Sequence, residues 1–389
     1  MSGFDFSKVR DYLPKELPKI DLSRVPTWPS IHTSMNPDDD QNPEGVSGSF
    51  PERDDLDDED GPSMVLTEPT PIQPGPKSNL DLMNECDNFP YYHVSPKTFA
   101  AHMDLYYVLQ VKQHPDVGLG YMLPSVVEVF RGLPDWKVDD TDRTLVLMAG
   151  DTEEERSRAV EATVGAMRAT NHFRVLKGWR DELYPIYGPN RKLLFSMERA
   201  ASALFGIVTY GCHMTAYTRT PEGQMKIWVP RRAKSKQTYG GMLDNTVAGG
   251  IATGEKVFES MIREAQEEAS LPEDIVRSKA KAVGTVTYFH IRDRRAGGET
   301  RLLMPECQYV YDLELDEDVV PKPSDTEVEG FELMTVEETK EAMRSGEFKP
   351  NCALVLLDFF VRHGFLTAED EGYIEIVARL HRRLEFPTL

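Results

Sequence analysis

The chain contains only four cysteines, and their positions exclude the usual cysteine-based frameworks. They lie far apart in a sequence of 389 residues, and no two of them form a Cys-x-x-Cys pair. Such a spacing predicts neither a structural zinc site nor a set of disulfide bonds. We therefore expect reduced, buried thiols in an intracellular protein, at Cys86, Cys212, Cys307 and Cys352.

Long apolar runs are also absent. The longest, Ala353–Val361, is interrupted by Asp358 and is too short to cross a bilayer. The first 19 residues contain acids and prolines without an apolar centre, so they predict neither a signal peptide nor a transit peptide. These absences predict a soluble, cytoplasmic protein with no membrane partner, and they leave the oligomeric state open.

Basic residues are scarce, because 44 Lys and Arg stand against 65 Asp and Glu, giving a formal net charge of −21. About half of that excess lies between residues 38 and 60, where eleven acids accompany the single base Arg53. This balance argues against nonspecific nucleic-acid binding. Residues 1–78 end in a proline-rich stretch and are predicted to form a disordered acidic tail and linker, in which residues 6–17 suit a short helix.

The rest of the chain is long enough for two folded regions. Residues 79–199 predict a small α+β domain without a recognisable catalytic constellation, and residues 200–389 predict an α/β domain that ends in helices. An irregular section is expected near residues 179–185. The patterns predict strands at 105–111, 144–148, 206–220, 224–229, 282–291, 306–314 and 327–333, and helices at 124–130, 153–170, 255–269, 336–344, 352–363 and 368–384.

Residues that could take part in catalysis or metal binding are concentrated between Gly249 and Leu271. A glycine-rich turn precedes the helix predicted at 255–269, and three carboxylates project from one face of that helix: Glu264, Glu267 and Glu268. Three like charges repel one another unless a cation neutralises them. Hard oxygen ligands suit Mg²⁺ or Mn²⁺, which commonly bridge protein carboxylates and substrate phosphates. The spacing therefore predicts a metal-bound diphosphate site.

Several cations adjoin these glutamates. Arg263 precedes the cluster, where it could either brace the carboxylates or meet a phosphate. Four more stand just before the glycine turn, at Arg231, Arg232, Lys234 and Lys236. They suit either the remaining charge of a diphosphate or an ordinary solvated loop, and the sequence does not separate these alternatives.

The stretch resembles the signature of the Nudix hydrolases. In that signature a glycine is followed after five residues by a glutamate, and after seven more by Arg-Glu and then a Glu-Glu pair. Every polar position is filled, by Gly249, Glu255, Arg263, Glu264, Glu267 and Glu268. One position departs, because Ser270 stands where the family has a late glycine, although this is not a ligand position. The resemblance implies a Nudix α/β/α sandwich with a mixed sheet.

The same resemblance implies metal-assisted hydrolysis of a small-molecule diphosphate. Arg263 would orient the glutamates, and Glu267 is the first choice for accepting the proton of the attacking water. Glu327 and Glu329, on a later strand, are alternative bases or ligands. The implied ligands of Mg²⁺ or Mn²⁺ are the side chains of Glu264, Glu267 and Glu268 and the carbonyl of Gly249.

The segments around the signature resemble one branch of that family. MERAASALFGIVTYGCHMTAY, VPRRAKSKQTYGGMLDN and KPNCALVLLDFFVRHGFL are similar to the thiamine-pyrophosphokinase-related Nudix proteins of fungi and plants, over about residues 79–386. This implies hydrolysis of oxo- or oxythiamine diphosphate to the monophosphate. Candidates for recognising the organic half, each of which also suits core packing, are Trp228, Tyr239 and Phe289.

Two other functions compete with this interpretation. The segment around Met242-Leu243-Asp244-Asn245 is similar to isopentenyl diphosphate isomerases, but residues 247–249 lack the cysteine that the isomerase reaction uses. A non-catalytic Nudix module that only binds its ligand is the second alternative. Loss of a signature glutamate would indicate such a module, and none is lost here.

Overall fold

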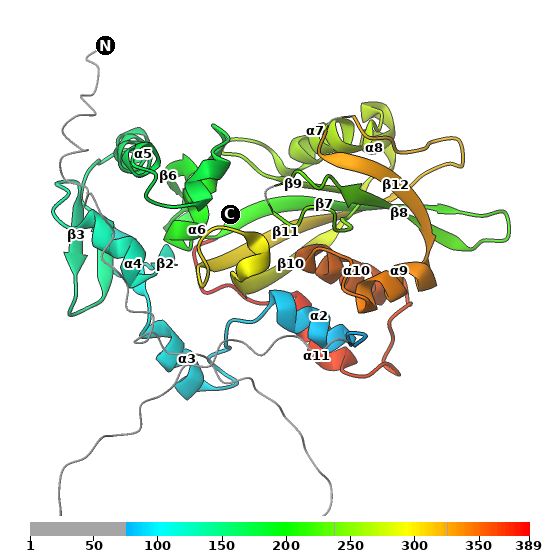
Figure 1. Ribbon diagram of the computed structural model, residues 1–389, viewed down its shortest axis with the longest axis horizontal. Helices are drawn as coiled ribbons and strands as arrows, with labels where there is room; N and C mark the ends of the chain where they lie inside the picture. The colour runs from blue at the N-terminus through cyan, green and yellow to red at the C-terminus, as the bar shows by residue number, and fades with distance from the viewer. Residues whose placement is uncertain (1–74, 237, 325) are drawn as a thin grey trace, which may run out of the picture. The chain divides into compact units, whose positions relative to one another are not determined.

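The computed structural model describes residues 75–236, 238–324 and 326–389 (Figure 1). Nearly all of the predicted acidic tail, and the short helix near residues 6–17, lie outside the described residues. Residues 76–389 lie within one compact unit. Within the described ranges, no helix is long and apolar enough to span a membrane. The predicted division between residues 199 and 200 stays a prediction.

The first part of the chain forms a four-stranded sheet in the order β2-β1-β4-β3. The strands at 105–111 and 144–148 and the helices at 124–130 and 153–170 are confirmed, because β1, β4, α4 with its following 3-10 turn, and α5 occupy those positions. Thr152 and Glu155 cap α5 by bonding reciprocally to backbone N–H groups. The bounds are β1 Tyr107–Val111, β2 Gly120–Met122, β3 Trp136–Asp139, β4 Thr144–Leu147, α3 Pro96–Met103, α4 Pro124–Val127 and α5 Glu153–Ala169.

An irregular section at residues 179–182, as the sequence predicted, leads into a β-hairpin. Strand β5, Leu183–Tyr187, pairs antiparallel with β6, Leu193–Glu198. The prediction was therefore right for residues 179–182 and wrong for residues 183–185, where Pro185 obscures the strand pattern. Helix α5 packs against β6, where the Arg156 Nε donates a hydrogen bond to the Leu194 carbonyl at 2.8 Å. The hairpin thus belongs to the same apolar core as the first sheet.

The second sheet is mixed, as the resemblance to the Nudix hydrolases implied. Its strand order is β10-β11-β7-β8-β12, with β9 paired to β7. Strands β11 and β7 run parallel, and the other pairs are antiparallel. The bounds are β7 Thr209–Arg219, β8 Met225–Arg232, β9 Val247–Gly250, β10 Lys281–Ile291, β11 Leu303–Glu314 and β12 Val328–Thr335.

Helices cover both faces of this sheet, which confirms the α/β/α sandwich (Figure 1). Side chains alternate between the faces of each strand. On β7, Cys212 and Met214 pack toward α7 and α8, whereas Tyr217 packs toward α2, α9, α10 and α11. The helices are α2 Asn79–Cys86, α7 Val257–Ala269, α8 Glu273–Lys279, α9 Val336–Arg344, α10 Pro350–Arg362 and α11 Tyr373–Leu380.

Three predicted boundaries were wrong. The strand at 206–220 begins only at Thr209, because the short helix α6, Ser202–Phe205, precedes it and ends at the left-handed Gly206. The last helix covers 373–380 instead of 368–384, since it starts after the left-handed Gly372. The signature helix begins at Val257, so Glu255 precedes it.

Ser270, the departure from the family signature, is the C-terminal cap of α7. Its backbone is left-handed, with φ 51° and ψ 30°, a conformation that glycine adopts more easily than serine. We expect Ser270→Gly to raise the free energy of unfolding by about 0.5–1 kcal/mol. Urea unfolding followed by circular dichroism would measure it.

A matched control is Ser345→Gly, because Ser345 caps α9 in a right-handed conformation with φ −74° and ψ −5°. This substitution gains no relief of strain and should lower stability. A Ser270→Gly variant no more stable than Ser345→Gly would contradict the explanation.

Candidate active site

The backbone of β9 lies directly against the carboxyl group of Glu264. Gly249 pairs with Cys212 of β7, which fixes β9 beside α7. A Cβ added to Gly249 would stand 2.0 Å from the Glu264 Cδ atom, so no larger residue fits while Glu264 keeps its position. Gly254 has a different requirement, because its φ of 83° is left-handed. The glycines of the turn therefore serve both close approach and a special backbone conformation.

Arg263 lies at the centre of a set of carboxylates. Its Nε donates to Glu255 Oε1 at 2.9 Å, and its Nη1 lies 3.0 Å from Glu264 Oε1 and 2.9 Å from Glu267 Oε2. Glu255 also accepts a hydrogen bond from the Ala252 N–H. The bracing contacts predicted for Arg263 are thus present, and its role in turnover stays a prediction.

Glu268 is held by the backbone of β9. Its Oε2 accepts a hydrogen bond of 2.9 Å from the Ala248 N–H on β9. Burial raises the pKa of Glu268 to about 8, and the charges of Glu264 and Asp244 add to this rise. Burial also raises the pKa of Glu264. The ionised forms of both groups are therefore disfavoured in the metal-free protein.

This donor set fits a hard divalent cation. Among the described residues, no group of three His, Cys, Asp or Glu side chains stands ready-made in a metal-binding arrangement, and Glu264 and Glu267 instead share Arg263. A cation beside Glu264 and Glu268 would favour the charged form that burial disfavours. Carboxylate and carbonyl oxygens are the ligands that Mg²⁺ and Mn²⁺ prefer.

The predicted cations do not all lie together. Arg232 forms an ion pair of 2.5 Å with Asp244, and Lys236 forms one with Glu327. Arg231, the strand neighbour of Arg232, instead pairs with Glu332 and Glu347. Neighbouring strand residues point to opposite faces, which explains this separation.

Lys234 and the two late glutamates lie beside this segment. Within the described ranges no ion pair is recorded for the Lys234 ammonium group, although its backbone N–H donates to Glu329 Oε1 at 3.2 Å. Burial raises the pKa of Glu327, but the hydrogen bond and charge of Lys236, helped by Arg180, outweigh burial and lower the pKa overall. Glu327 is thus a carboxylate held in its ionised form.

The three aromatic candidates are not brought together. Phe289 stacks on Phe89 and lines a cavity of about 560 Å³ whose lining does not include the signature helix. Trp228 packs in the core beneath α7, and its buried Nε1 has no hydrogen-bond partner among the residues that the structure describes. Tyr239 is half-buried near Asp293, which together with burial raises the pKa of its hydroxyl. The structure favours core packing for Phe289.

Sequence reasoning missed the side chains that the β5–β6 hairpin brings to the glycine turn. A Cβ on Gly250 would stand 1.9 Å from the Tyr184 Oη and 3.3 Å from the Arg199 Nη1. The Thr253 N–H donates to the Leu183 carbonyl at 2.8 Å. Leu183 and Tyr184 lie in no recognised motif, and Arg199, although it belongs to the segment MERAASALFGIVTYGCHMTAY, has no spacing that relates it to the turn. Only the fold shows that these residues lie beside the glycines.

Parts of this chain match two known domain families. The model of the NUDIX domain matches residues 213–352, and that of a domain of unknown function matches residues 108–209. An uncharacterized protein of Saccharomyces cerevisiae is 36% identical over 326 residues, covering 80% of this chain and 93% of that protein.

Two similar proteins come from Arabidopsis thaliana. Nudix hydrolase 24, chloroplastic, is 34% identical over 279 residues, which cover 67% of this chain and 73% of that protein. Nudix hydrolase 20, chloroplastic, is 39% identical over 232 residues, which cover 59% of each chain.

Proposed function

We propose, since the chain belongs to the Nudix hydrolase family and is a diphosphate hydrolase, that its substrate is a thiamine-like organic diphosphate. Oxo- and oxythiamine diphosphate, cleaved to the monophosphate and phosphate, are the specific candidates. The observation that carries the hydrolytic site is the approach of two signature carboxylates, Glu264 and Glu268, to the backbone of β9. The thiamine-like half is supported by the resemblance of the flanking segments to one branch of the family.

Mg²⁺ or Mn²⁺ would be held by Glu264, Glu267, Glu268 and the carbonyl of Gly249. When bound there, the cation would polarise a phosphate oxygen and lower the pKa of water. The protein's own part is to hold these groups in place. Arg263 fixes Glu264 and Glu267 from one side, and the Ala248 N–H fixes Glu268 from the other.

Glu267 remains our first choice for the proton acceptor. Its side chain is more than half exposed, so a water molecule can reach it. Glu327 is held by two cations, Lys236 and Arg180, and a carboxylate with a lowered pKa is a weaker base. Glu329 already accepts a hydrogen bond from Lys234.

The isomerase alternative gains no support from the cysteines. Cys212 is the register partner of Gly249, but its side chain is buried beneath α7. Burial raises the pKa of the Cys212 thiol to about 12. A thiol that is fully buried between the sheet and α7 is closed off from a substrate and is poorly placed to transfer a proton to it.

A substrate panel tests the proposal. The purified full chain would be incubated with Mg²⁺ or Mn²⁺ and with thiamine, oxothiamine and oxythiamine diphosphates, ADP-ribose, a dinucleoside polyphosphate and isopentenyl diphosphate. Phosphorus NMR would identify the products. We expect turnover of the thiamine-like compounds and its loss when EDTA removes the metal.

Three results would contradict parts of this proposal. Preferred cleavage of ADP-ribose or the dinucleoside polyphosphate would reject the thiamine-like substrate and keep the hydrolase. Isomerised isopentenyl diphosphate would reject hydrolysis. Binding without cleavage of any compound would favour the binding module.

A further inference from the structure

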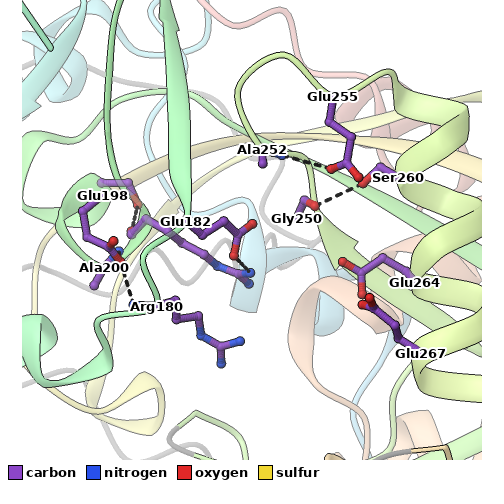
Figure 2. A network of polar contacts seen from close by, with 12 residues as sticks. Arg180, Glu182, Glu198, Ala200, Gly250, Ala252, Glu255, Ser260, Glu264 and Glu267 are labelled. Carbon is purple, nitrogen blue, oxygen red and sulfur yellow. Dashed lines mark hydrogen bonds and ion pairs between the residues drawn. The ribbon is translucent and has the colours of Figure 1, made fainter.

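The β5–β6 hairpin forms one wall beside the signature glycines. Figure 2 shows Arg180 and Glu182 on one side and Glu264 and Glu267 of α7 on the other, with their side chains pointing toward one another. The Thr253 Oγ1 also donates to the Ser196 Oγ of β6 at 3.0 Å. The hairpin and the turn after β9 are therefore joined by backbone and side-chain hydrogen bonds.

Arg199 carries the positive charge of this wall. Its Nη1 donates to Glu182 Oε2 at 2.8 Å, and its guanidinium carbon lies 5.4 Å from the centre of the Tyr184 ring. The backbone N–H of Arg199 donates to the Glu182 carbonyl at 2.8 Å, so the residue is anchored at both ends. A fixed guanidinium loses little conformational entropy when it binds a ligand.

Most of the donors on this guanidinium remain available. Among the described residues, only Glu182 is recorded as a hydrogen-bond partner of the Arg199 side chain, and it engages Nη1 alone. A third of the side chain is exposed, so the remaining N–H groups can meet a ligand. These donors lie beside Gly250, one residue after the backbone that contacts Glu264.

We propose that Arg199 binds a phosphate group of the substrate, so that the active site combines carboxylates of the signature with a cation from the preceding region. A diphosphate carries more negative charge than one divalent cation neutralises. The planar fork of a guanidinium matches the oxygens of a phosphate. This inference rests on the proposed diphosphate substrate and adds the residue that holds it.

Arg180 belongs to the same wall. Its backbone N–H donates to Glu198 Oε1 at 3.0 Å, and its Nη1 lies 3.8 Å from Glu327 Oε1. That distance is long for a hydrogen bond, so the guanidinium can turn toward a phosphate at small cost. Arg180 therefore supplies a second, weaker cation, and Arg199 is the group to test first.

The decisive comparison is between Arg199→Ala and Glu182→Gln in the full chain. If Arg199 only forms a structural ion pair, removing either partner has the same effect. If Arg199 binds phosphate, Arg199→Ala raises KM for the best diphosphate by about 10- to 100-fold, and Glu182→Gln changes KM much less. Arg199→Lys keeps the charge without the fork and should lie between them. Lys192→Ala, at the exposed tip of the same hairpin, should match the wild type.

Binding of inorganic phosphate, titrated by phosphorus NMR in the presence of Mg²⁺, gives a readout without turnover. We expect Arg199→Ala to weaken this binding by at least about tenfold. Equal effects of Arg199→Ala and Glu182→Gln, or unchanged phosphate binding in folded Arg199→Ala or Arg199→Lys, would overturn the proposal. Failure of the wild type to cleave any diphosphate would reject the proposed function, while phosphate binding would still decide the role of Arg199.

Discussion

Glu268→Gln is expected to lower kcat by about a thousandfold, with a much smaller change in stability. The substitution keeps the hydrogen bond from the Ala248 N–H but removes the charge that would bind the cation. Because burial raises the pKa of Glu268 to about 8, the neutral amide resembles the form that dominates in the metal-free protein at pH 7. Steady-state kinetics and thermal unfolding of the metal-free variant would measure both effects.

Glu259→Gln is the matched control on the same helix. Glu259 is half exposed and pairs with Arg277 on the outer side of α7, so its loss should leave kcat unchanged. A second readout is proton release when the wild type binds Mg²⁺ at pH 7. Ionising Glu268 should release about one proton, and Glu268→Gln should release none from this position. An active Glu268→Gln enzyme would refute the assignment of the metal site.

Gly249→Ala is expected to lower kcat/KM by about a hundredfold while the free energy of unfolding changes by no more than about 1 kcal/mol. The new methyl group would overlap the Glu264 side chain, whose Cδ stands 2.0 Å from the Cβ position. Glu264 is flexible enough to swing away, so the fold tolerates the change. A displaced carboxylate, however, no longer lies beside Glu268, and the metal affinity falls.

Gly330→Ala provides the comparison for this variant. Gly330 lies in β12, and apart from its chain neighbours no atom of the described residues comes within 4 Å of the place where its Cβ would stand. It should keep full activity. If Gly249→Ala keeps wild-type activity and metal affinity, then the close approach of Glu264 to β9 has no catalytic significance. If Gly249→Ala unfolds the protein, then the assumption that the Glu264 side chain can move away from the new methyl group is wrong.

The local pattern predicted the signature helix and the strands of the second sheet well, whereas the mixed order of that sheet was implied by the resemblance to the Nudix hydrolases. Apolar residues at every fourth position, from Val257 to Ala269, identified α7, and the strand patterns identified β7, β8, β10, β11 and β12 to within a few residues. These features depend on neighbours in sequence, where periodicity is informative. The family's preference for glycine at position 270 has a local explanation, because the residue there, Ser270 in this chain, caps α7 in a left-handed conformation.

Contacts between distant segments could not be predicted in the same way. The pairing of Arg231 with Glu332, and of Arg232 with Asp244, depends on which face of β8 each side chain occupies in the folded sheet. No spacing in the sequence relates Tyr184 of the hairpin, or Arg199 just after it, to Gly250, and their position beside this glycine is set by packing between two regions. Periodicity contains no information about such encounters.

The close approach of Tyr184 to Gly250 limits which residues can replace either of them. With 1.9 Å between the Tyr184 hydroxyl and the place of a Cβ at position 250, a larger residue there requires a smaller one at position 184. We therefore expect substitutions at positions 184 and 250 to be coupled. A chimera that joins this C-terminal half to a foreign partner would lose the fit, so recombination between relatives is expected to succeed only when both halves are exchanged as a pair.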